Sequence, residues 1–232
     1  MKLRTSLYPV IFLLLCLGCS KDDNHQKVIF SFQFLSDSEA WTGDFADYPA
    51  GEEDFYELLF EYSTLPAPLD ETKGALKISG NNHSDDLFMF IKRKISGLNP
   101  EATYKVSFII QFATNVADNQ FGVGGSPGEG VTIKAGATQI EPNKIPDIYD
   151  DSYYIMNIDK GNQIQGGIDM VTVGDFSNDT NQNIYTLKTV TNQTPFQVKA
   201  NENGELWLVV GTDSGFESTT TIYYNQIYVI LN

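Results

Sequence analysis

Few residues in this chain could carry out hydrolytic chemistry, and they are widely spaced. A serine nucleophile needs a histidine base, and the sequence contains two histidines, His25 and His83. His83 is followed closely by Asp85 and Asp86, whereas a serine in an active-site-like context, Ser214, lies far along the chain. A triad of His83, one of the two aspartates and Ser214 would require the fold to bring these distant segments together.

Acidic residues are more numerous, but their spacing does not indicate catalysis. The triplet Asp213-Ser214-Gly215 is similar to that of aspartic proteases, which continue with Ser or Thr and use a second copy; here Phe216 follows and no second copy exists. A glycosidase needs two carboxylates held across a cleft, whereas adjacent acids on polar loops are usually solvated. Such adjacent acids occur at 52–54, 85–86 and 150–151. We therefore predict a protein that is not an enzyme, with no catalytic residues assigned.

Metal-binding patterns are also incomplete. One histidine outside the amino-terminal region and no spare cysteine cannot form a closed zinc site. Calcium needs only oxygen ligands, and Asp175, Asp179 and Asn181 alternate in a way that resembles a calcium loop. The glycine expected at the sixth position is Thr180, and no glutamate closes the loop. We expect no cofactor, with calcium left open at these three residues.

The amino terminus has the pattern of a secretory signal. Two cations, Lys2 and Arg4, precede an apolar run from Leu7 to Leu17, which is too short to span a hydrocarbon core of roughly 30 Å as a permanent helix. Gly18-Cys19 then resembles the lipobox of bacterial lipoproteins. That resemblance implies cleavage of residues 1–18 and lipidation at Cys19, which would anchor the chain to outer-membrane lipid. Two or more acyl chains give stable anchoring.

Residues 19–27 are polar and are expected to form a flexible tether. The run Lys21-Asp22-Asp23 resembles the export signal of Bacteroidetes-type surface lipoproteins. The expected location is therefore the outer membrane with the chain facing the cell exterior, and the periplasmic face is the alternative.

The charge of the chain excludes one class of partner. The sequence has 15 Lys and Arg against 30 Asp and Glu, a formal net charge of −15, and loss of Lys2 and Arg4 with the signal would make it more negative. A field of this sign repels phosphate backbones, so nucleic acid is not an expected partner.

Alternating apolar residues dominate the rest of the sequence and predict strands. The clearest is Tyr104 to Phe112, and Leu87 to Ile91 has the continuous apolar run of a central strand. The best helical candidate, Glu53 to Phe60, is ambiguous. We predict one all-β domain over residues 28–232, an antiparallel jelly-roll-like β-sandwich of about 10–12 strands with little helix. Further strands are expected near 30–34, 76–78, 131–135, 153–158, 170–176, 185–190, 196–198, 206–210 and 221–231.

Several of these segments resemble galactose-binding-like jelly rolls, a fold to which many carbohydrate-binding modules belong. The segments are the opening strand and loop through Trp41-Thr42-Gly43, the strand 74–80, the turn and strand 98–108, and the closing strand 220–229. The resemblance implies a carbohydrate-binding function. In the closing strand Asn225 stands where such modules often have Asp, which removes support for an inherited calcium site there.

Aromatic residues in or beside polar loops are the candidate ligand-binding residues, because exposed rings form apolar platforms for sugars. The glycine-rich run 122–130 lacks the Lys and helix start of a phosphate loop; we expect tight turns there, with ligand contact as an alternative. The leading hypothesis is a non-catalytic surface module that binds carbohydrate or another extracellular ligand. The alternatives are a structural or accessory subunit of an outer-membrane complex, and a hydrolase. The candidate ligand-binding residues are Trp41, Tyr48, Phe55, Tyr56, Tyr149, Tyr153 and Phe216.

Overall fold

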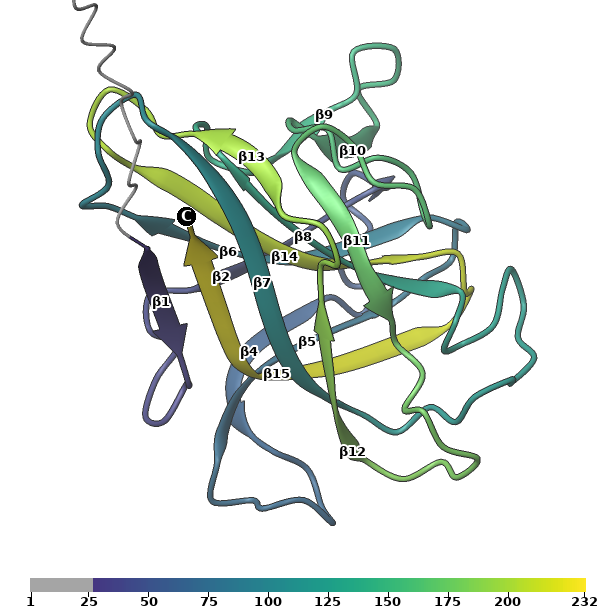
Figure 1. The fold of residues 1–232 in the computed structure, drawn as a ribbon. Coiled ribbons are helices and arrows are strands. Elements are labelled where there is room, and N and C mark those ends of the chain that lie inside the picture. The colour runs from purple at the N-terminus through teal and green to yellow at the C-terminus, as the bar shows by residue number, and fades with distance from the viewer. Residues whose placement is uncertain (1–26) are drawn as a thin grey trace, which may run out of the picture.

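The computed structural model describes residues 27–232, which fold into an all-β sandwich (Figure 1). All strand pairs in this part of the chain are antiparallel, and they form two large sheets and one small sheet. The predicted fold class is confirmed. The predicted signal, Cys19 and nearly all of the tether lie outside the described residues.

The larger sheet has seven strands in the order β12-β7-β15-β5-β4, with β1 added beside β15 and β13 beside β7. Its centre is the pair β7 and β15, the two longest strands. Their alternating apolar residues place one face toward the other sheet, as period-2 sequences require. The strands are β1 (Val28–Phe32), β4 (Leu59–Thr64), β5 (Gly74–Asn81), β7 (Thr103–Thr114), β12 (Thr186–Thr191), β13 (Phe196–Lys199) and β15 (Thr219–Leu231).

The second sheet has five strands in the order β11-β8-β14-β6-β2. Its inner face packs on the larger sheet, and its outer face carries a second apolar cluster that includes Phe88, Phe90 and Val209. Burial on both faces explains the nearly continuous apolar run in β6. The strands are β2 (Thr42–Ala46), β6 (Leu87–Ile95), β8 (Val131–Thr138), β11 (Met170–Asp175) and β14 (Leu206–Ser214).

A covering segment, defined here as residues 139–169, lies across the outer face of the five-stranded sheet. It contains β9 (Lys144–Pro146) and β10 (Tyr153–Met156), which join β3 (Tyr48–Pro49) in the small sheet β3-β10-β9. Met156 and Ile158 of this segment belong to the outer apolar cluster. Gly136 of β8 allows the close approach, because a Cβ there would lie 2.1 Å from the carbonyl oxygen of Asp169.

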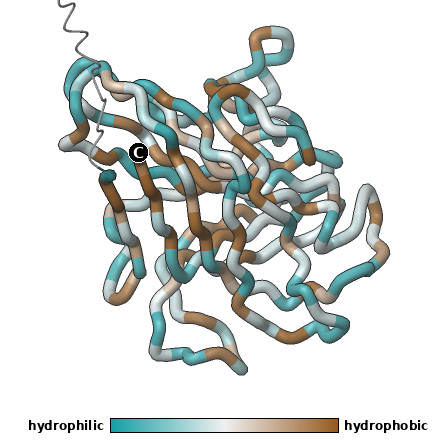
Figure 2. The backbone as a smooth tube through the Cα atoms, viewed as in Figure 1, coloured by the Kyte–Doolittle hydropathy of each residue, from teal (hydrophilic) through white to brown (hydrophobic). Residues whose placement is uncertain are grey.

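The main core lies between the two large sheets and draws residues from nearly every strand. Figure 2 shows hydrophobic positions distributed along the strands of the sandwich. Phe108 and Phe112 of β7 stack on Phe196 and Phe176 at ring-centroid distances of 6.2 Å. Strand pairing and three buried apolar clusters hold the described residues together as a sandwich.

Every segment predicted as a strand contains one in the structure, whereas the helical candidate at Glu53 to Phe60 is wrong. Residues 53–57 form consecutive turns and the chain then enters β4, which pairs with β5. Pairing with β5 and burial of Tyr56 outweigh a weak local helical preference. Among residues 27–232, no helix is long and apolar enough to cross a membrane.

Replacement of Phe108 by Ala should lower the free energy of unfolding by about 3–5 kcal/mol, because it removes a fully buried ring from the main core. Urea denaturation of residues 27–232 measures this change. Phe121→Ala is the matched control, because Phe121 is fully exposed and its loss should shift stability by less than about 0.5 kcal/mol. Equal effects of the two substitutions would contradict the assignment of the core.

Candidate functional site

Three of the seven aromatic candidates are buried in the core. Trp41 contacts Phe32 edge-on with ring centroids 5.3 Å apart, and Tyr48 and Tyr56 contact each other at 5.6 Å. The Tyr48 hydroxyl accepts a hydrogen bond from Lys144 Nζ at 2.6 Å and donates one to Glu53 Oε1 at 3.1 Å. Burial leaves these three rings no free face on which a sugar could stack.

The other four aromatic candidates do not form one platform. Phe55 is 57% exposed and stacks on His83 with centroids 4.1 Å apart. Tyr153 is partly buried beside Ser84. Tyr149 is 92% exposed in the turn before β10, and Phe216 packs at the glycine-rich loop, where a Cβ on Gly122 would meet its ring at 2.5 Å. The structure thus brings Phe55, Tyr56 and Tyr153 to the same region as His83 and Ser84.

The structure does not assemble a serine triad. His83 Nε2 lies 3.2 Å from the carbonyl oxygen of Phe55, and its ring stacks on the Phe55 ring. Ser214 Oγ donates a hydrogen bond to the carbonyl oxygen of Phe216 at 3.2 Å. Each side chain therefore has a local structural partner of its own.

A lysine occupies the centre of the calcium candidate. Lys188 Nζ lies 2.8 Å from Asp175 Oδ1 and 2.9 Å from Asp179 Oδ1, and Asn181 is exposed. The ammonium group supplies the positive charge that a calcium ion would bring, so this loop is held by an ion pair.

The glycine-rich loop 122–130 is shaped by close packing rather than by tight turns alone. Only Gly124 within it has a positive φ, of 70°. A Cβ at Gly128 would lie 2.8 Å from Ser177 Cβ, and one at Gly130 would lie 2.5 Å from the carbonyl oxygen of Ser126. These glycines let the loop lie against its neighbours.

The most unusual group of side chains is a charge cluster formed by Asp47, Asp86, Lys134, Lys160 and Asp213. Asp47 follows β2, Asp86 directly precedes β6, and Lys160 belongs to the covering segment. Lys134 lies in β8 and Asp213 in β14. Lys134 pairs with Gly211, two residues before Asp213, so both side chains project from the outer face of adjacent strands. The covering segment closes over them and supplies Lys160.

The centre of the charge cluster is the fully buried ion pair of Lys134 and Asp213. Lys134 Nζ donates to Asp213 Oδ2 at 2.7 Å and to the carbonyl oxygens of Lys160 and Gln165, each at 2.9 Å. Lys160 Nζ lies 2.9 Å from Asp213 Oδ2 and 2.8 Å from Asp47 Oδ2. The two ammonium groups are therefore shared between two carboxylates and two backbone carbonyls.

Asp86 is the acid in the charge cluster that no cation neutralises directly. Burial and the nearby carboxylates of Asp47 and Asp213 raise the pKa of Asp86 to about 7, against a weaker lowering effect of Lys160. The Oδ1 atoms of Asp86 and Asp213 are both buried without a hydrogen-bond partner from other groups. A proton held on Asp86 and donated to Asp213 satisfies both oxygens.

A cavity of about 260 Å³ opens onto this charge cluster. Asp47, Asp86 and Lys160 contribute its charged wall. The apolar wall consists of the partly exposed Ile155 and the edges of Met156 and Ile158, which are themselves buried in the outer apolar cluster. Asp159, Gly161 and Asn162 complete the lining. The volume lies just below the usual range of ligand sites, about 300–1,000 Å³, which fits one small polar unit. The cavity and its charge cluster are the candidate functional site.

The three aspartates could suggest a metal centre, because one oxygen of each lies within 4.8 Å of the others. The two lysines argue against this interpretation. A divalent ion among these oxygens would have to displace Lys160 from Asp47 and Asp213 and would face the buried charge of Lys134. Because the lysines already occupy the oxygens of Asp47 and Asp213, the residues present fit a lysine–aspartate cluster better than a metal site.

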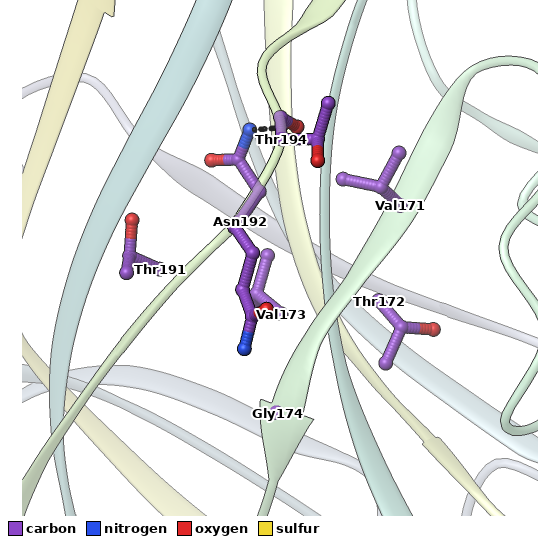
Figure 3. Close-up of a pocket in the computed structure, with 8 residues that line it drawn as sticks. Val171, Thr172, Val173, Gly174, Thr191, Asn192 and Thr194 are labelled. Atoms are coloured by element: carbon purple, nitrogen blue, oxygen red, sulfur yellow. Dashed lines mark hydrogen bonds between the residues drawn. The ribbon is translucent and has the colours of Figure 1, made fainter.

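A larger groove of about 460 Å³ lies between β11 and the connection from β12 to β13 (Figure 3). Its polar residues are used internally. Asn192 Nδ2 donates to the carbonyl oxygens of Val106 and Thr194, and Thr191 Oγ1 donates to that of Phe108. Neither a charged nor an aromatic side chain lines it. The groove marks the open edge of the sandwich and offers less for recognition than the cavity.

In the sequence, Asp86 and Asp213 stand out only as members of local motifs, and Asp47, Lys134 and Lys160 were not predicted as site residues. One signal was present. Lys134 interrupts the predicted strand Val131 to Ala135, at a position where both faces of the sheet are covered. A lysine in such a strand needs a buried acid. The identity of its partners depends on the fold.

No protein-family model matches the chain, and no curated protein sequence matches it. Solved structures with similar arrangements include carbohydrate-binding β-sandwiches. One is a carbohydrate-binding module studied for specific mannan recognition. The match covers 89% of this chain and 99% of the module's chain, with 13% sequence identity and a TM-score of 0.39. Another is the family 11 carbohydrate-binding module of a cellulosomal cellulase from Clostridium thermocellum. That match covers 87% of this chain and 94% of the module's chain, with 7% sequence identity and a TM-score of 0.39.

A third structure shows that such neighbours are not all binding modules. The enzymatically active domain of tailspike protein 4 from bacteriophage CBA120 matches 84% of this chain with 9% identity and a TM-score of 0.37, and the match spans 20% of that domain's chain. Similarity at this level carries no argument about what the present chain binds.

Replacement of Lys134 by Met should lower the free energy of unfolding by about 3–5 kcal/mol, because it leaves Asp213 buried with less compensation and removes two hydrogen bonds to the covering segment. Thermal or urea unfolding measures the change. Lys199→Met is the control, since its ion pair with Glu101 is half-exposed and should be worth less than about 1 kcal/mol. If Lys134→Met left the free energy of unfolding unchanged, the charge cluster would not stabilise the fold.

Proposed function

We propose that this chain is a non-catalytic binding protein, carried on the cell surface by lipid at Cys19, whose ligand is a glycan. The cavity beside the charge cluster is the binding site for one saccharide unit. The observation that carries the proposal is the combination in one cavity of a charged hydrogen-bonding wall, formed by Asp47, Asp86 and Lys160, and an apolar wall, formed by the partly exposed Ile155 and the edges of the buried Met156 and Ile158. Sugars present hydroxyl groups on their edges and C–H groups on their faces, and this cavity complements both.

The aromatic pair Phe55 and His83 supports an extended binding site. A connected path leads from this pair to the cavity: His83 is followed by Ser84, Ser84 is hydrogen-bonded to Tyr153, and Tyr153 interacts with the charges of Asp47 and Asp86. Burial and these acids raise the pKa of Tyr153 to about 12, so its hydroxyl stays neutral and can donate hydrogen bonds. On this proposal, the exposed part of the Phe55 ring is the contact for a second sugar unit.

The absence of catalysis is part of the proposal. Glycosidases hold an acid and a base on opposite sides of the scissile bond. Here Asp213 is fully buried beneath Lys134 and Lys160, and Asp47 is bound to Lys160. Asp86 alone among the three presents an uncommitted carboxyl group to the cavity. The remaining acid of the lining, Asp159, is held by the backbone N–H groups of Ile168 and Gly161. The cavity therefore presents one free carboxyl group, which can orient a ligand but does not form the acid–base pair of a glycosidase.

Residues 27–232 should bind one or more glycans on an array of plant, host and microbial saccharides, and Phe55→Ala should weaken that binding by about threefold to tenfold, as loss of one ring contact does. Isothermal titration with the strongest array ligand measures the change. Phe121→Ala is the control, because Phe121 is exposed in a different loop. Failure to bind any glycan would contradict the proposed function.

Lipid attachment has its own test in the intact chain. Labelled palmitate should be incorporated by the natural sequence and not by Cys19→Ser, since no other cysteine follows the signal. External protease on whole cells should then remove the natural protein if it faces the exterior. Protection of the lipidated protein from protease would place it on the periplasmic face instead.

A further inference from the structure

The charges of the candidate site do not balance. The charge cluster contains three carboxyl groups, Asp47, Asp86 and Asp213, and two ammonium groups, Lys134 and Lys160. Both lysines are committed: Lys134 to Asp213, and Lys160 to Asp47 and Asp213. With all five groups ionised, one negative charge remains, and the connectivity assigns it to Asp86.

A buried, uncompensated carboxylate is costly, so it acquires either a proton or a cationic partner. Asp213, whose side chain is fully buried, directs an oxygen without a partner, Oδ1, into the cluster. Asp86 Oδ1 is likewise without a partner, and Asp86 also lines the cavity. The two Oδ1 atoms have almost no accessible surface, so a ligand in the cavity meets the residual charge through the part of Asp86 that lines it.

The mouth of the cavity adds a second negative charge. Asp159 accepts hydrogen bonds from the backbone N–H groups of Gly161 and Ile168, which lowers its pKa and keeps it ionised. Of the residues that line the cavity, Lys160 alone carries a positive charge, and its Nζ is held between Asp47 and Asp213. The field inside the cavity thus favours a cation over an anion.

We propose that the cavity selects a saccharide unit bearing a protonated primary amine, and that the ammonium group pairs with the carboxyl group of Asp86 at the cavity wall, while Asp86 releases its proton to solvent. This inference rests on the proposed function and names the ligand class of the same site. An ammonium group with three donors can serve Asp86 and neighbouring oxygens, while the apolar wall contacts the sugar ring. Uronic-acid, sulfated and phosphorylated sugars are excluded by like charge.

Exchange of an ammonium group for a proton gives binding a characteristic pH dependence. The titratable groups that face Asp86 are Asp47, Lys134, Lys160, Asp213 and Tyr153. Because the pKa of Asp86 is about 7 in the free protein, binding should strengthen as pH rises through 7. It should weaken again at higher pH, when the ligand amine loses its own proton.

The test compares two matched oligosaccharides by isothermal titration against residues 27–232 at pH 6.5, where both Asp86 and the ligand amine hold a proton before binding: a glucosamine oligomer and its fully N-acetylated counterpart, which lacks the charge. The amine form should bind about tenfold tighter or more, because charge-assisted hydrogen bonds are roughly twice as strong as neutral ones. Titrations in two buffers of different ionisation enthalpy should show proton release on binding.

Two substitutions separate the role of Asp86 from general acidity. Asp86→Asn should reduce the preference for the amine to less than about twofold, without a large loss of stability because the amide keeps the size of the side chain. Asp85→Asn is the matched control: Asp85 is exposed, and Asn tolerates its φ of 60°. The control should keep the full preference.

The outcomes distinguish this inference from the proposed function. Equal binding of the amine and acetylated forms, or an unchanged preference in Asp86→Asn, would overturn the inference while leaving glycan binding intact. Binding of neither form, together with no glycan binding on the array, would remove the proposed function itself. If a lysine-containing peptide bound with the same affinity as the glucosamine oligomer, the cavity would recognise the amine alone, and the saccharide assignment would be overturned.

Discussion

Lys134 lies on the outer face of the five-stranded sheet with its ammonium group fully buried, and it must find acceptors there. It finds Asp213 on the neighbouring strand and the carbonyl oxygens of Lys160 and Gln165 in the covering segment. A buried ammonium group without these partners would cost several kcal/mol. The requirement therefore fixes the path of residues 160–165 across the sheet, and with it the position of the apolar residues Met156 and Ile158 on the outer cluster.

The same requirement creates the cavity. Two lysines bring the covering segment close to the sheet, but they cannot satisfy three carboxyl groups completely. Asp86 is left facing the space between β6 and the covering segment, with a pKa raised to about 7 by burial and by its acidic neighbours. In this arrangement the structural role of the charge cluster and its capacity to bind a ligand have one origin, because the ion pairs that close the covering segment leave one charge unpaired.

The sequence predicted the sandwich well, since alternation marks half-buried strands directly: residues 104–112 and 206–210 fall within β7 and β14. Four strands, β2, β3, β4 and β9, were not predicted. Strands β3 and β9 are too short to show a pattern of their own, and β4 begins inside the segment that was considered as a helix. The same limit applied to the aromatic residues, as Trp41 and Tyr48 occur in polar segments yet are buried by contacts with distant residues.

The candidate site was harder to predict because it joins five segments that are far apart in the chain. Asp47 and Lys160 lie in irregular segments where charged residues are usually solvated. Only Lys134, inside a strand covered on both faces, signalled a buried partner. Asp213 could be noticed as part of Asp-Ser-Gly, but its pairing with Lys134 follows from the register of β8 against β14.

The central claim is that Asp86 carries the unbalanced charge of the charge cluster, and the most direct test is a carbon-13 NMR titration of the aspartate side-chain carboxyl groups in residues 27–232. The account predicts that the Asp86 carboxyl carbon titrates with a midpoint near pH 7. A midpoint close to the ordinary aspartate value of about 3.9 would contradict it, because Asp86 would then be neutralised by a partner other than a proton.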